Sequence, residues 1–301
     1  MASRWPSVLA VAQRTFLLVA VVSIGAYLTR HAEDLRSLLT WRLAWHCAAA
    51  AAVLAALHPL IAWGFYQLQR FNGIAIDFPA SLGIYMRRIP ARYVPGGVWH
   101  SVSRLADMRW SADVPAGLLR RQFLTEVGVV AGSGLLVCAL ALWCLPDTGA
   151  VHLVAAAQTG LGAATAVVGA ALLFHRAGSW RLLLAALLYV VIWPLAALAF
   201  SVLSAGFDIE GRTCALPTTA ATYLVSAVQG YLAFFAPQGW GVTEASFAML
   251  DPCARSVQRI LATFLMYRLS AIGGDVLGYG LWAVAARRPV LNRLSRLPKA
   301  Q

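Results

Sequence analysis

One short stretch, ARYVPGGVWHSVSR (residues 91–104), decides how this chain folds. In it, Pro95, Gly96 and Gly97 lie between two arginines, and a histidine follows. Proline lacks a backbone N–H donor and glycine is a poor helix former, so the stretch interrupts any helix that enters it. The short apolar segment 74–86 precedes the interruption, and residues 98–109 can resume as helix. We therefore expect a helical hairpin over about residues 74–110.

The rest of the chain is unusually apolar, because 60% of its 301 residues are hydrophobic and only 12% are charged. Its mean hydropathy is +0.70. Soluble proteins usually carry about a quarter charged residues, so this composition indicates that the bilayer is the solvent. The expected fold class is all-α, in a polytopic membrane protein with a single integral membrane domain over residues 1–301.

Six apolar runs are long enough to cross a bilayer core about 30 Å thick, which takes roughly 20 helical residues. These runs are 9–29, 43–66, 123–145, 152–174, 181–205 and 258–286. The first has no small-x-small cleavage site and further spans follow it, so we expect an anchor helix rather than a signal peptide. A seventh run, 218–236, is ambiguous because Pro237, Gly239 and Gly241 would break a helix directly after it.

Positive charge predicts the orientation of these spans. The net charge is +12, and the arginines flank apolar runs instead of forming one solvated patch, which argues for topology rather than a nucleic-acid partner. Loop 67–122 and the basic tail 287–301 should then be cytoplasmic, as should the N-terminus, in a plasma (inner) membrane. Seven full crossings would leave the tail outside. We therefore expect residues 215–252 to form a second re-entrant hairpin.

Two arrangements satisfy these charges. In one, the first hairpin enters from the cytoplasm and the second from outside, like the broken helices of inverted-repeat transporters. Irregular backbone at that depth must be buried in protein or line a wet cavity. In the other, residues 98–110 form an interfacial amphipathic helix and 218–236 cross fully. The charge pattern leaves both open.

Polar side chains follow the first break. His100, Ser103, Arg104 and Asp107 recur at spacings of three, four and seven, so they share one face of the expected helix. Glycine N–H groups and a helix N-terminus attract phosphate, which Arg92, Arg104 or Arg87 can clamp. Alternatively, arginines in such a loop anchor the topology, with their guanidinium groups reaching the lipid headgroups.

Ionisable groups inside apolar runs are further candidates, because charge in a bilayer needs a partner or a cavity. Glu126 lies near the start of one span, and Arg268 and Asp275 lie seven residues apart on another, too far apart to pair directly. A buried structural pair of Glu126 with Arg104 or Arg268 is one interpretation. A relay for protons or lipid headgroups is the other.

Glu244 has two interpretations of its own. If Gly241 caps a helix, Glu244 falls at the third helical position, where a carboxylate satisfies free N–H groups. It can also face a substrate, and the two roles are compatible.

The cysteines, histidines and sequence motifs argue against several other classes of site. The five cysteines show no CxxC spacing and lie mostly in or beside apolar runs, which favours buried thiols over disulfides. The histidines form no HxxxH pair or Cys/His cluster, so we expect no metal and no cofactor. Gly274 and Gly278 form a GxxxG pair that we assign to helix packing. No Walker A motif, DxD pair or GxSxG elbow occurs.

Four elements together carry a family resemblance: RYVPGGVWHSVSR (92–104), Glu126, PQGWGVTEASF (237–247) and YRL around Arg268. They resemble the pattern of the lysylphosphatidylglycerol synthase/flippase transmembrane-domain family, over about residues 10–290. The resemblance implies a lipid-translocating domain with two re-entrant elements, and with Arg104, Glu126, Glu244 and Arg268 at the family's polar positions. Gln238 departs from the pattern, because the family usually has glycine there. No aminoacyl-transferase domain follows in this sequence, so lysine transfer is not implied.

These features predict a transporter that moves an anionic lipid, such as a phospholipid, a polyprenyl phosphate or a phosphoglycolipid, across the plasma membrane. The expected substrate-binding residues are Arg92, Gly96, Gly97, His100, Arg104, Glu126, Gly239, Gly241, Glu244 and Arg268. The expected partners are membrane lipids, a second copy of the chain or a protein of envelope biosynthesis, and no nucleic acid. The alternative is a membrane-embedded enzyme or accessory subunit of cell-envelope glycolipid assembly, with Glu126 or Glu244 as base.

Overall fold

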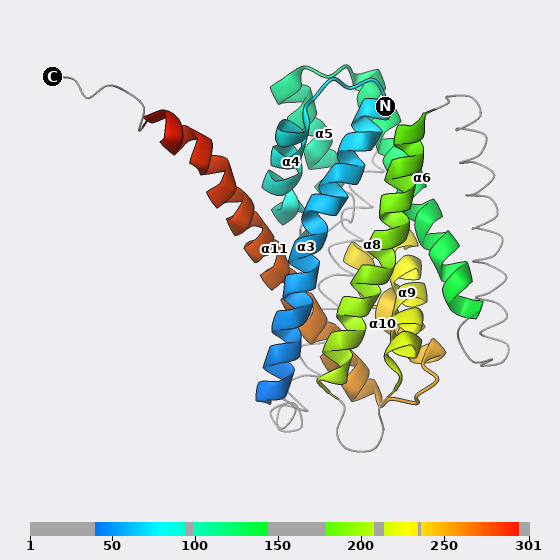
Figure 1. Cartoon of the computed structure of the whole chain (residues 1–301). Coiled ribbons are helices and arrows are strands. Elements are labelled where there is room, and N and C mark those ends of the chain that lie inside the picture. Colours follow the sequence, from blue (N-terminus) through cyan, green and yellow to red (C-terminus); the bar gives the residue numbers. More distant parts are fainter. Residues whose placement is uncertain (1–39, 94–98, 144–178, 208–213, 234–235, 295–301) are drawn as a thin grey trace, which may run out of the picture.

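The computed structural model describes residues 40–93, 99–143, 179–207, 214–233 and 236–294, and within these ranges every regular element is a helix (Figure 1). The four long helices are α3 (Trp41–Phe71), α6 (Ala116–Trp143), α8 (Trp180–Ala205) and α11 (Val257–Leu294). The four short ones are α4 (Phe78–Arg87), α5 (Trp99–Ala112), α9 (Leu216–Leu232) and α10 (Val242–Leu250). Two 3₁₀ turns, η1 (Ile89–Tyr93) and η2 (Pro237–Gly239), lie between the short helices. The expected all-α class is confirmed for this part of the chain.

Within the described part of the chain, four helices are long and apolar enough to cross a membrane. Their candidate spans are Trp41–Phe71, Ala116–Ala141, Trp180–Ala205 and Val257–Ala286. These match the expected spans at 43–66, 123–145, 181–205 and 258–286. Large apolar side chains such as Leu187, Val191, Val276 and Leu281 are exposed on them, which suits a surface solvated by lipid tails. The expected spans at 9–29 and 152–174, the N-terminus and the last residues of the basic tail lie outside the described residues.

A 3₁₀ turn separates the short helices in each half of the described chain, and the expected first break at Pro95, Gly96 and Gly97 lies outside the described residues. α4 and α5 flank η1, and together they form the first hairpin; α9 and α10 flank η2 and form the second hairpin. Asp77 caps the N-terminus of α4, and its Oδ1 accepts a hydrogen bond from the N–H of Ala80 at 2.9 Å. α9 is 17 residues long and ends at Leu232, before the end of the apolar run at 218–236. Among the described helices it is therefore not one of the four candidate spans.

The described elements fall into two series with the same order. From α3 to α6 the order is a long helix, a short helix, a 3₁₀ turn, a short helix and a long helix. The same order of elements recurs from α8 to α11. The first helices of the two series, α3 and α8, pack against each other in opposite directions. Arg42 at the start of α3 donates to the carbonyl of Ala205 at the end of α8 at 3.5 Å. Leu68 near the end of α3 packs with Leu182 near the start of α8.

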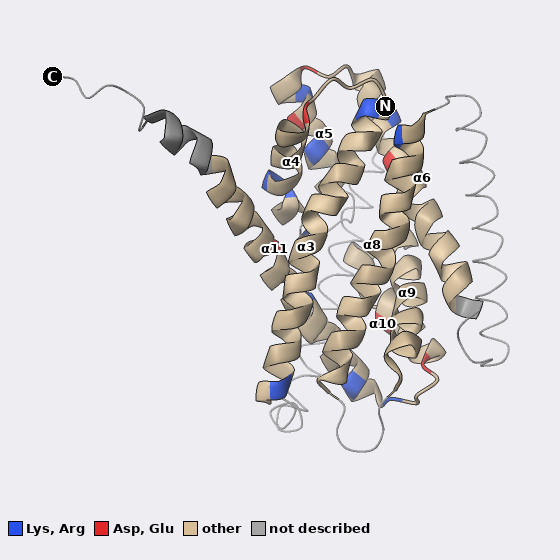
Figure 2. Ribbon diagram, in the orientation of Figure 1, with Lys and Arg blue, Asp and Glu red and all other residues tan. Residues whose placement is uncertain are grey.

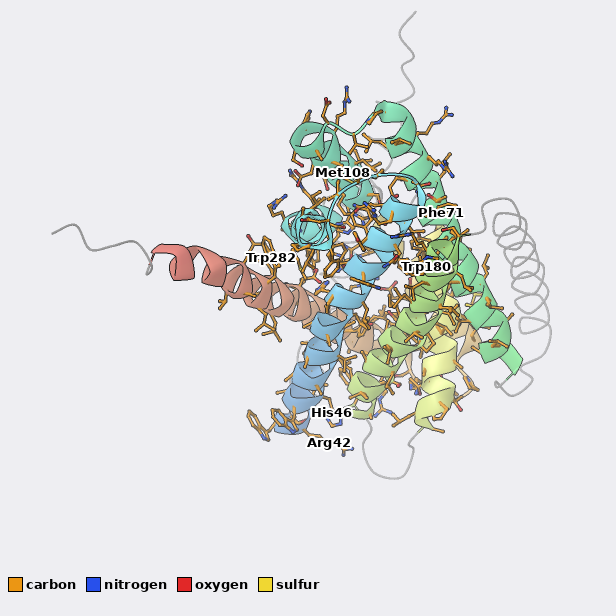
Figure 3. All side chains as sticks on the ribbon, turned by 45° about the horizontal axis from the view of Figure 1, so that its top comes forward. Arg42, His46, Phe71, Met108, Trp180 and Trp282 are labelled. Atoms are coloured by element: carbon orange, nitrogen blue, oxygen red, sulfur yellow. A yellow bond between two sulfur atoms is a disulfide. The ribbon has the colours of Figure 1, made fainter. Side chains whose placement is uncertain are left out.

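The two hairpins consequently lie toward opposite ends of the molecule. Asn72, which follows α3, donates to Gln122 of α6 at 2.9 Å, and the first hairpin lies at this end, at the top of Figure 1. Figure 3, a tilted view, labels Phe71 and Met108 toward this end, and Arg42 and His46 at the other. At that other end, the bottom of Figure 1, α8 ends and both α9 and α11 begin. The first hairpin thus lies at one end of the helix bundle, and the second starts from the opposite end.

A disulfide closes the second hairpin. Cys214 precedes α9 and Cys253 follows α10, and the two are bonded although they lie 39 residues apart in sequence. Our prediction of thiols was therefore wrong for this pair: cysteine spacing shows no link between residues that a hairpin brings together from its two ends. Cys47 and Cys138 are free thiols, as predicted, and Cys144 lies outside the described residues.

The core holds each hairpin against the long helices. Phe65 of α3, Tyr85 of α4 and Met108 of α5 belong to one buried cluster. Around Phe200 of α8, a second cluster gathers aromatic side chains from α9, α10 and α11, with rings 4.1–5.4 Å away: Tyr223, Phe247, Phe264 and Tyr267. Aromatic packing of this kind fixes the second hairpin between α8 and α11.

Candidate functional site

The two breaks touch each other. The side-chain amide of Gln238 in η2 donates to the backbone carbonyl of Arg92 in η1, across 146 residues of sequence. Gln238 itself has φ 50° and ψ 29°, the left-handed region that favours glycine. One helix, α11, pairs with elements on both sides of this contact: Asp275 with Arg92 of η1, and Arg268 with Glu244 of α10, which follows η2. The expected candidates Arg92, Glu244 and Arg268 therefore lie around this contact.

Asp275 on α11 binds partners from two other elements. Nη1 of Arg92 donates to its Oδ1 at 2.9 Å and to its Oδ2 at 3.1 Å, and the Tyr93 hydroxyl donates to Oδ2 at 2.6 Å. Nε2 of His58 on α3 lies 3.1 Å from Oδ1. Nδ1 of the same imidazole lies 3.2 Å from the Tyr85 hydroxyl. Asp275 is buried, whereas 36% of the Arg92 side chain is exposed.

Glu244 has both of the roles that the sequence left open. Its Oε2 accepts a hydrogen bond from the N–H of Gly241 at 2.8 Å, which caps α10, and its Oε1 accepts one from Nη2 of Arg268 at 2.6 Å. The Arg268 guanidinium also lies 4.5 Å from the centre of the Trp240 ring. Because 18% of the Arg268 side chain is exposed, this pair is less deeply buried than the next one.

Arg104 and Glu126 form a buried ion pair. Only 3% of the Arg104 side chain and 10% of that of Glu126 are exposed. The guanidinium lies 4.4 Å from the Phe65 ring centre. This is one of the two pairings expected for Glu126, and Arg268 pairs with Glu244 instead. Nη1 of Arg104 and the hydroxyl of Tyr189 are buried and have no hydrogen-bond partner among the described residues.

Side chains on the polar face of α5 bind partners in two different parts of the molecule. Arg104 turns to α6, whereas Asp107 accepts from Nη2 of Arg87 at 3.3 Å and from Nε of Arg88 at 3.1 Å. Nδ1 of His100 lies 2.9 Å from the Arg88 carbonyl, so the imidazole donates there. Burial lowers the pKa of His100 well below its usual range, and the charges of Arg104 and Arg92 add to the shift. His100 is therefore neutral near pH 7.

The glycines expected to bind substrate have local roles in the turn. Gly239 has φ +69°, and a Cβ there would lie 2.7 Å from the Cα of Gly230. Gly241 has φ +80° and caps α10. Both are positions that only glycine fills without strain. Gly96 and Gly97 lie outside the described residues.

Sequence reasoning missed several members of this site. His58, Tyr85 and Tyr93 were not singled out, and the contact of Gln238 with Arg92 was not foreseen. A signal for His58 did exist, because it is an ionisable residue inside an apolar run. The GxxxG pair was the second signal: a Cβ on Gly278 would lie 2.5 Å from Cδ2 of His58, and one on Gly274 would lie 2.8 Å from the Ala51 carbonyl.

One further group has the composition of a metal site. Cys214, Asp251 and Cys253 bring three ligand-type atoms within 4.8 Å of one another. The disulfide uses both sulfurs, and a metal requires thiolates. The carboxylate of Asp251 instead pairs with Arg255. This group therefore closes the hairpin.

Comparison with models of known protein families, with curated proteins and with solved structures yields no match to this chain.

Proposed function

We propose that this chain is a lipid transporter of the plasma (inner) membrane. In this proposal the two hairpins are re-entrant and meet inside the bilayer. An anionic headgroup passes beside their breaks while its acyl or prenyl tails remain in lipid. The observation that carries the proposal is the contact between η1 and η2, with ion-paired Arg92 and Arg268 beside it.

The position of α11 supports a location at membrane depth. Arg268 and Asp275 both fall inside its apolar segment Val257–Ala286, away from either end. Arg268 pairs with Glu244 in the first turn of α10, just after η2, and Asp275 pairs with Arg92 of η1. Charges and interrupted backbone are costly in hydrocarbon, so transporters that use them there tie them to each other and to a substrate path.

The chemistry of the two accessible arginines supports an anionic headgroup. Among the described residues, the side chain of Arg92 donates only through Nη1, and that of Arg268 only through Nε and Nη2. Each guanidinium thus keeps N–H groups with no partner in the described part of the chain. A planar fork of donors suits phosphate oxygens. Arg104 is enclosed, so we assign it to positioning the first hairpin.

The opposite direction of the two series supports transport between leaflets. Inverted repeats with a broken helix from each half are the usual architecture for alternating access around a fixed site. Here each break is tied to α11 by an ion pair, so exchange of a carboxylate for a phosphate at one arginine loosens one hairpin at a time.

Charge and disulfide chemistry support the same orientation. More basic residues lie around the end that carries the first hairpin than around the other (Figure 2), as expected for the cytoplasmic side. The disulfide of Cys214 and Cys253 closes the opposite end, and such bonds persist outside the cytoplasm. We therefore assign the Cys214 end to the outer face.

The alternative role as an enzyme or assembly subunit finds less support. Glu126 is paired with Arg104, and Glu244 is held by Arg268 and by the N–H of Gly241. Neither carboxylate can take a proton from a substrate without first breaking an ion pair.

Reconstituted vesicles test the proposal. Purified protein is placed in liposomes that contain fluorescent phosphatidylglycerol, and dithionite quenches the outer leaflet. We expect the wild-type chain to expose the inner-leaflet lipid to quenching, with no change in lipid mass. Arg92→Ala and Arg268→Ala should slow this step about tenfold or more.

Arg109→Ala is the matched control, because Arg109 forms an exposed pair with Asp113 and should have no effect. Wild-type protein that leaves the inner leaflet protected would refute transport. Redistribution that survives both substitutions would refute the site.

A further inference from the structure

The imidazole of His58 is buried where α3 packs closely against α11. It is 2% exposed, on α3, and the absence of a side chain at Gly278 lets α11 approach it closely. Both ring nitrogens face polar groups, with Tyr85 on one side and Asp275 on the other. Headgroup binding at Arg92 and Arg268 does not itself require this imidazole.

The groups around His58 balance in charge when the imidazole is neutral. Tyr85 of α4 and Asp275 of α11 contact it, and Arg92 and Tyr93 of η1 bind the same carboxylate. The next charged groups outward are paired with each other or are neutral; they are Arg104 and His100 of α5, Glu126 of α6 and Tyr189 of α8. Asp275 therefore has one full positive partner, Arg92.

An anion at Arg92 upsets this balance. If a phosphate oxygen takes the guanidinium, the Tyr93 hydroxyl and His58 are the neighbours that Asp275 keeps among the described residues. The cluster then carries an excess negative charge in a medium of low dielectric, where uncompensated charge is costly. The nearest group that can become a cation is His58, 3.1 Å away.

We propose that the His58–Asp275 pair is a proton-binding site that takes up one proton for each anionic headgroup bound at Arg92. This rests on the proposed function only in that Arg92 meets a headgroup. In the unloaded state Nδ1 accepts from the Tyr85 hydroxyl, and Nε2–H lies 3.1 Å from Oδ1 of Asp275 without the geometry of a hydrogen bond. A proton from water then binds the Nδ1 lone pair, and the Tyr85 hydroxyl turns to accept from it. When the headgroup leaves, Arg92 returns to Asp275 and the proton departs.

Tyr85 is suited to this turn. Burial raises its pKa to about 12, so its hydroxyl stays protonated and can act as donor or acceptor. One singly charged headgroup and one proton cross together with no net charge. The coupled step is then driven by a pH difference and not by membrane potential.

Calorimetry on the purified protein in detergent tests the proton directly. The probe is dihexanoyl phosphatidylglycerol, whose phosphate diester does not titrate near pH 7. Binding heats are measured in two buffers of different ionisation enthalpy, and their difference counts the protons taken up. We expect about one proton per lipid for the wild-type chain and close to none for His58→Gln and for Asp275→Asn.

His46→Gln is the matched control on the same helix, because His46 bonds only to the Arg42 carbonyl in the described chain, and proton uptake should be unchanged. Wild-type binding with no difference between buffers overturns the inference, even if either variant fails to fold.

A pH gradient across the vesicles separates the two proposals. With one pH unit between inside and outside, we expect fluorescent phosphatidylglycerol to accumulate up to about tenfold in the leaflet on the basic side. Redistribution that stays symmetrical overturns proton coupling and leaves lipid transport standing. If the wild-type chain moves no lipid, the proposed function fails, and calorimetry alone decides on the proton site.

Discussion

The two hairpins carry the same kind of ion pair with the charges exchanged. In the first, Arg104 on α5 pairs with Glu126 on the next long helix, 22 residues later; in the second, Glu244 on α10 pairs with Arg268 on the next long helix, 24 residues later. Exposure separates them, since 3% of the Arg104 side chain is accessible but 18% of that of Arg268. The same order of elements thus carries a buried pair, Arg104 with Glu126, and a more exposed pair, Glu244 with Arg268. We call them the sealed pair and the accessible pair. Of these two pairs, only the accessible one can exchange its carboxylate for an external anion.

The largest effect should come from breaking the sealed pair. Arg104→Ala leaves the Glu126 carboxylate buried without a cation, and removing one partner of such a pair costs about 3–5 kcal/mol. Thermal unfolding of the detergent-solubilised protein, followed by size-exclusion profile, measures the loss. Arg109→Ala breaks an exposed pair and should cost about 0–1 kcal/mol. Equal losses for the two substitutions would show that the first pair is not sealed.

Two glycines with positive φ, one in the turn of the second hairpin and one just before the first hairpin, allow a second comparison. Gly239→Ala places a Cβ 2.7 Å from the Cα of Gly230 at φ +69°, so steric collision adds to backbone strain. We expect a loss of about 3 kcal/mol in unfolding free energy. Gly73 precedes the first hairpin at φ +79° with nothing within 4 Å, so Gly73→Ala should cost only the strain, about 1–2 kcal/mol. If Gly73→Ala proves the worse, α9 and α10 are not packed so closely.

The sequence predicted the parts of this comparison that depend on neighbouring residues. The hairpin expected at 74–110 covers α4 and all but the last two residues of α5, and the expected break at Pro237 and its glycines lies between α9 and α10. These signals are local, because proline and glycine disturb the backbone close to where they stand. The Gly241 cap and Glu244 at its third position are likewise local and were foreseen. Such features need no knowledge of the rest of the fold.

The partners could not be predicted, because they come from distant segments. Arg92 and Asp275 lie 183 residues apart, and the choice of Glu126 between Arg104 and Arg268 depends on which helices become neighbours. Residue spacing also shows nothing about whether a pair is sealed or accessible. The disulfide was missed for the same reason, since only the closed hairpin brings Cys214 to Cys253.

The accessible pair should respond to a neutral substitution with a gain. Glu244→Gln removes the carboxylate that competes for Arg268, while the amide oxygen can still cap α10. We expect dihexanoyl phosphatidylglycerol to bind about tenfold more tightly, equivalent to about 1.4 kcal/mol. Calorimetry measures the change. Glu126→Gln should bring no gain in affinity, because Arg104 is enclosed, and a gain there would move the headgroup site to the first hairpin.

The smallest effect should come from the bond that joins the hairpins, and two substitutions at one position isolate it. Gln238→Ala keeps the left-handed backbone strained but loses the bond to the Arg92 carbonyl, a cost of about 0.5–1.5 kcal/mol. Gln238→Gly loses the same bond but relieves strain of about 1 kcal/mol, so its stability should stay near that of the wild-type chain. Thermal unfolding should therefore rank glycine above alanine.

The rate of lipid redistribution should not rank these two variants in the way that their thermal stability does. If contact between the breaks sets the position of Arg92, both variants lose this contact equally. They should then change the rate of redistribution to the same extent, despite their unequal stability. A rate that follows stability instead, with the glycine variant indistinguishable from wild type, would mean that the Gln238 amide stabilises its own turn. The two breaks would then act independently, each through its own ion pair on α11.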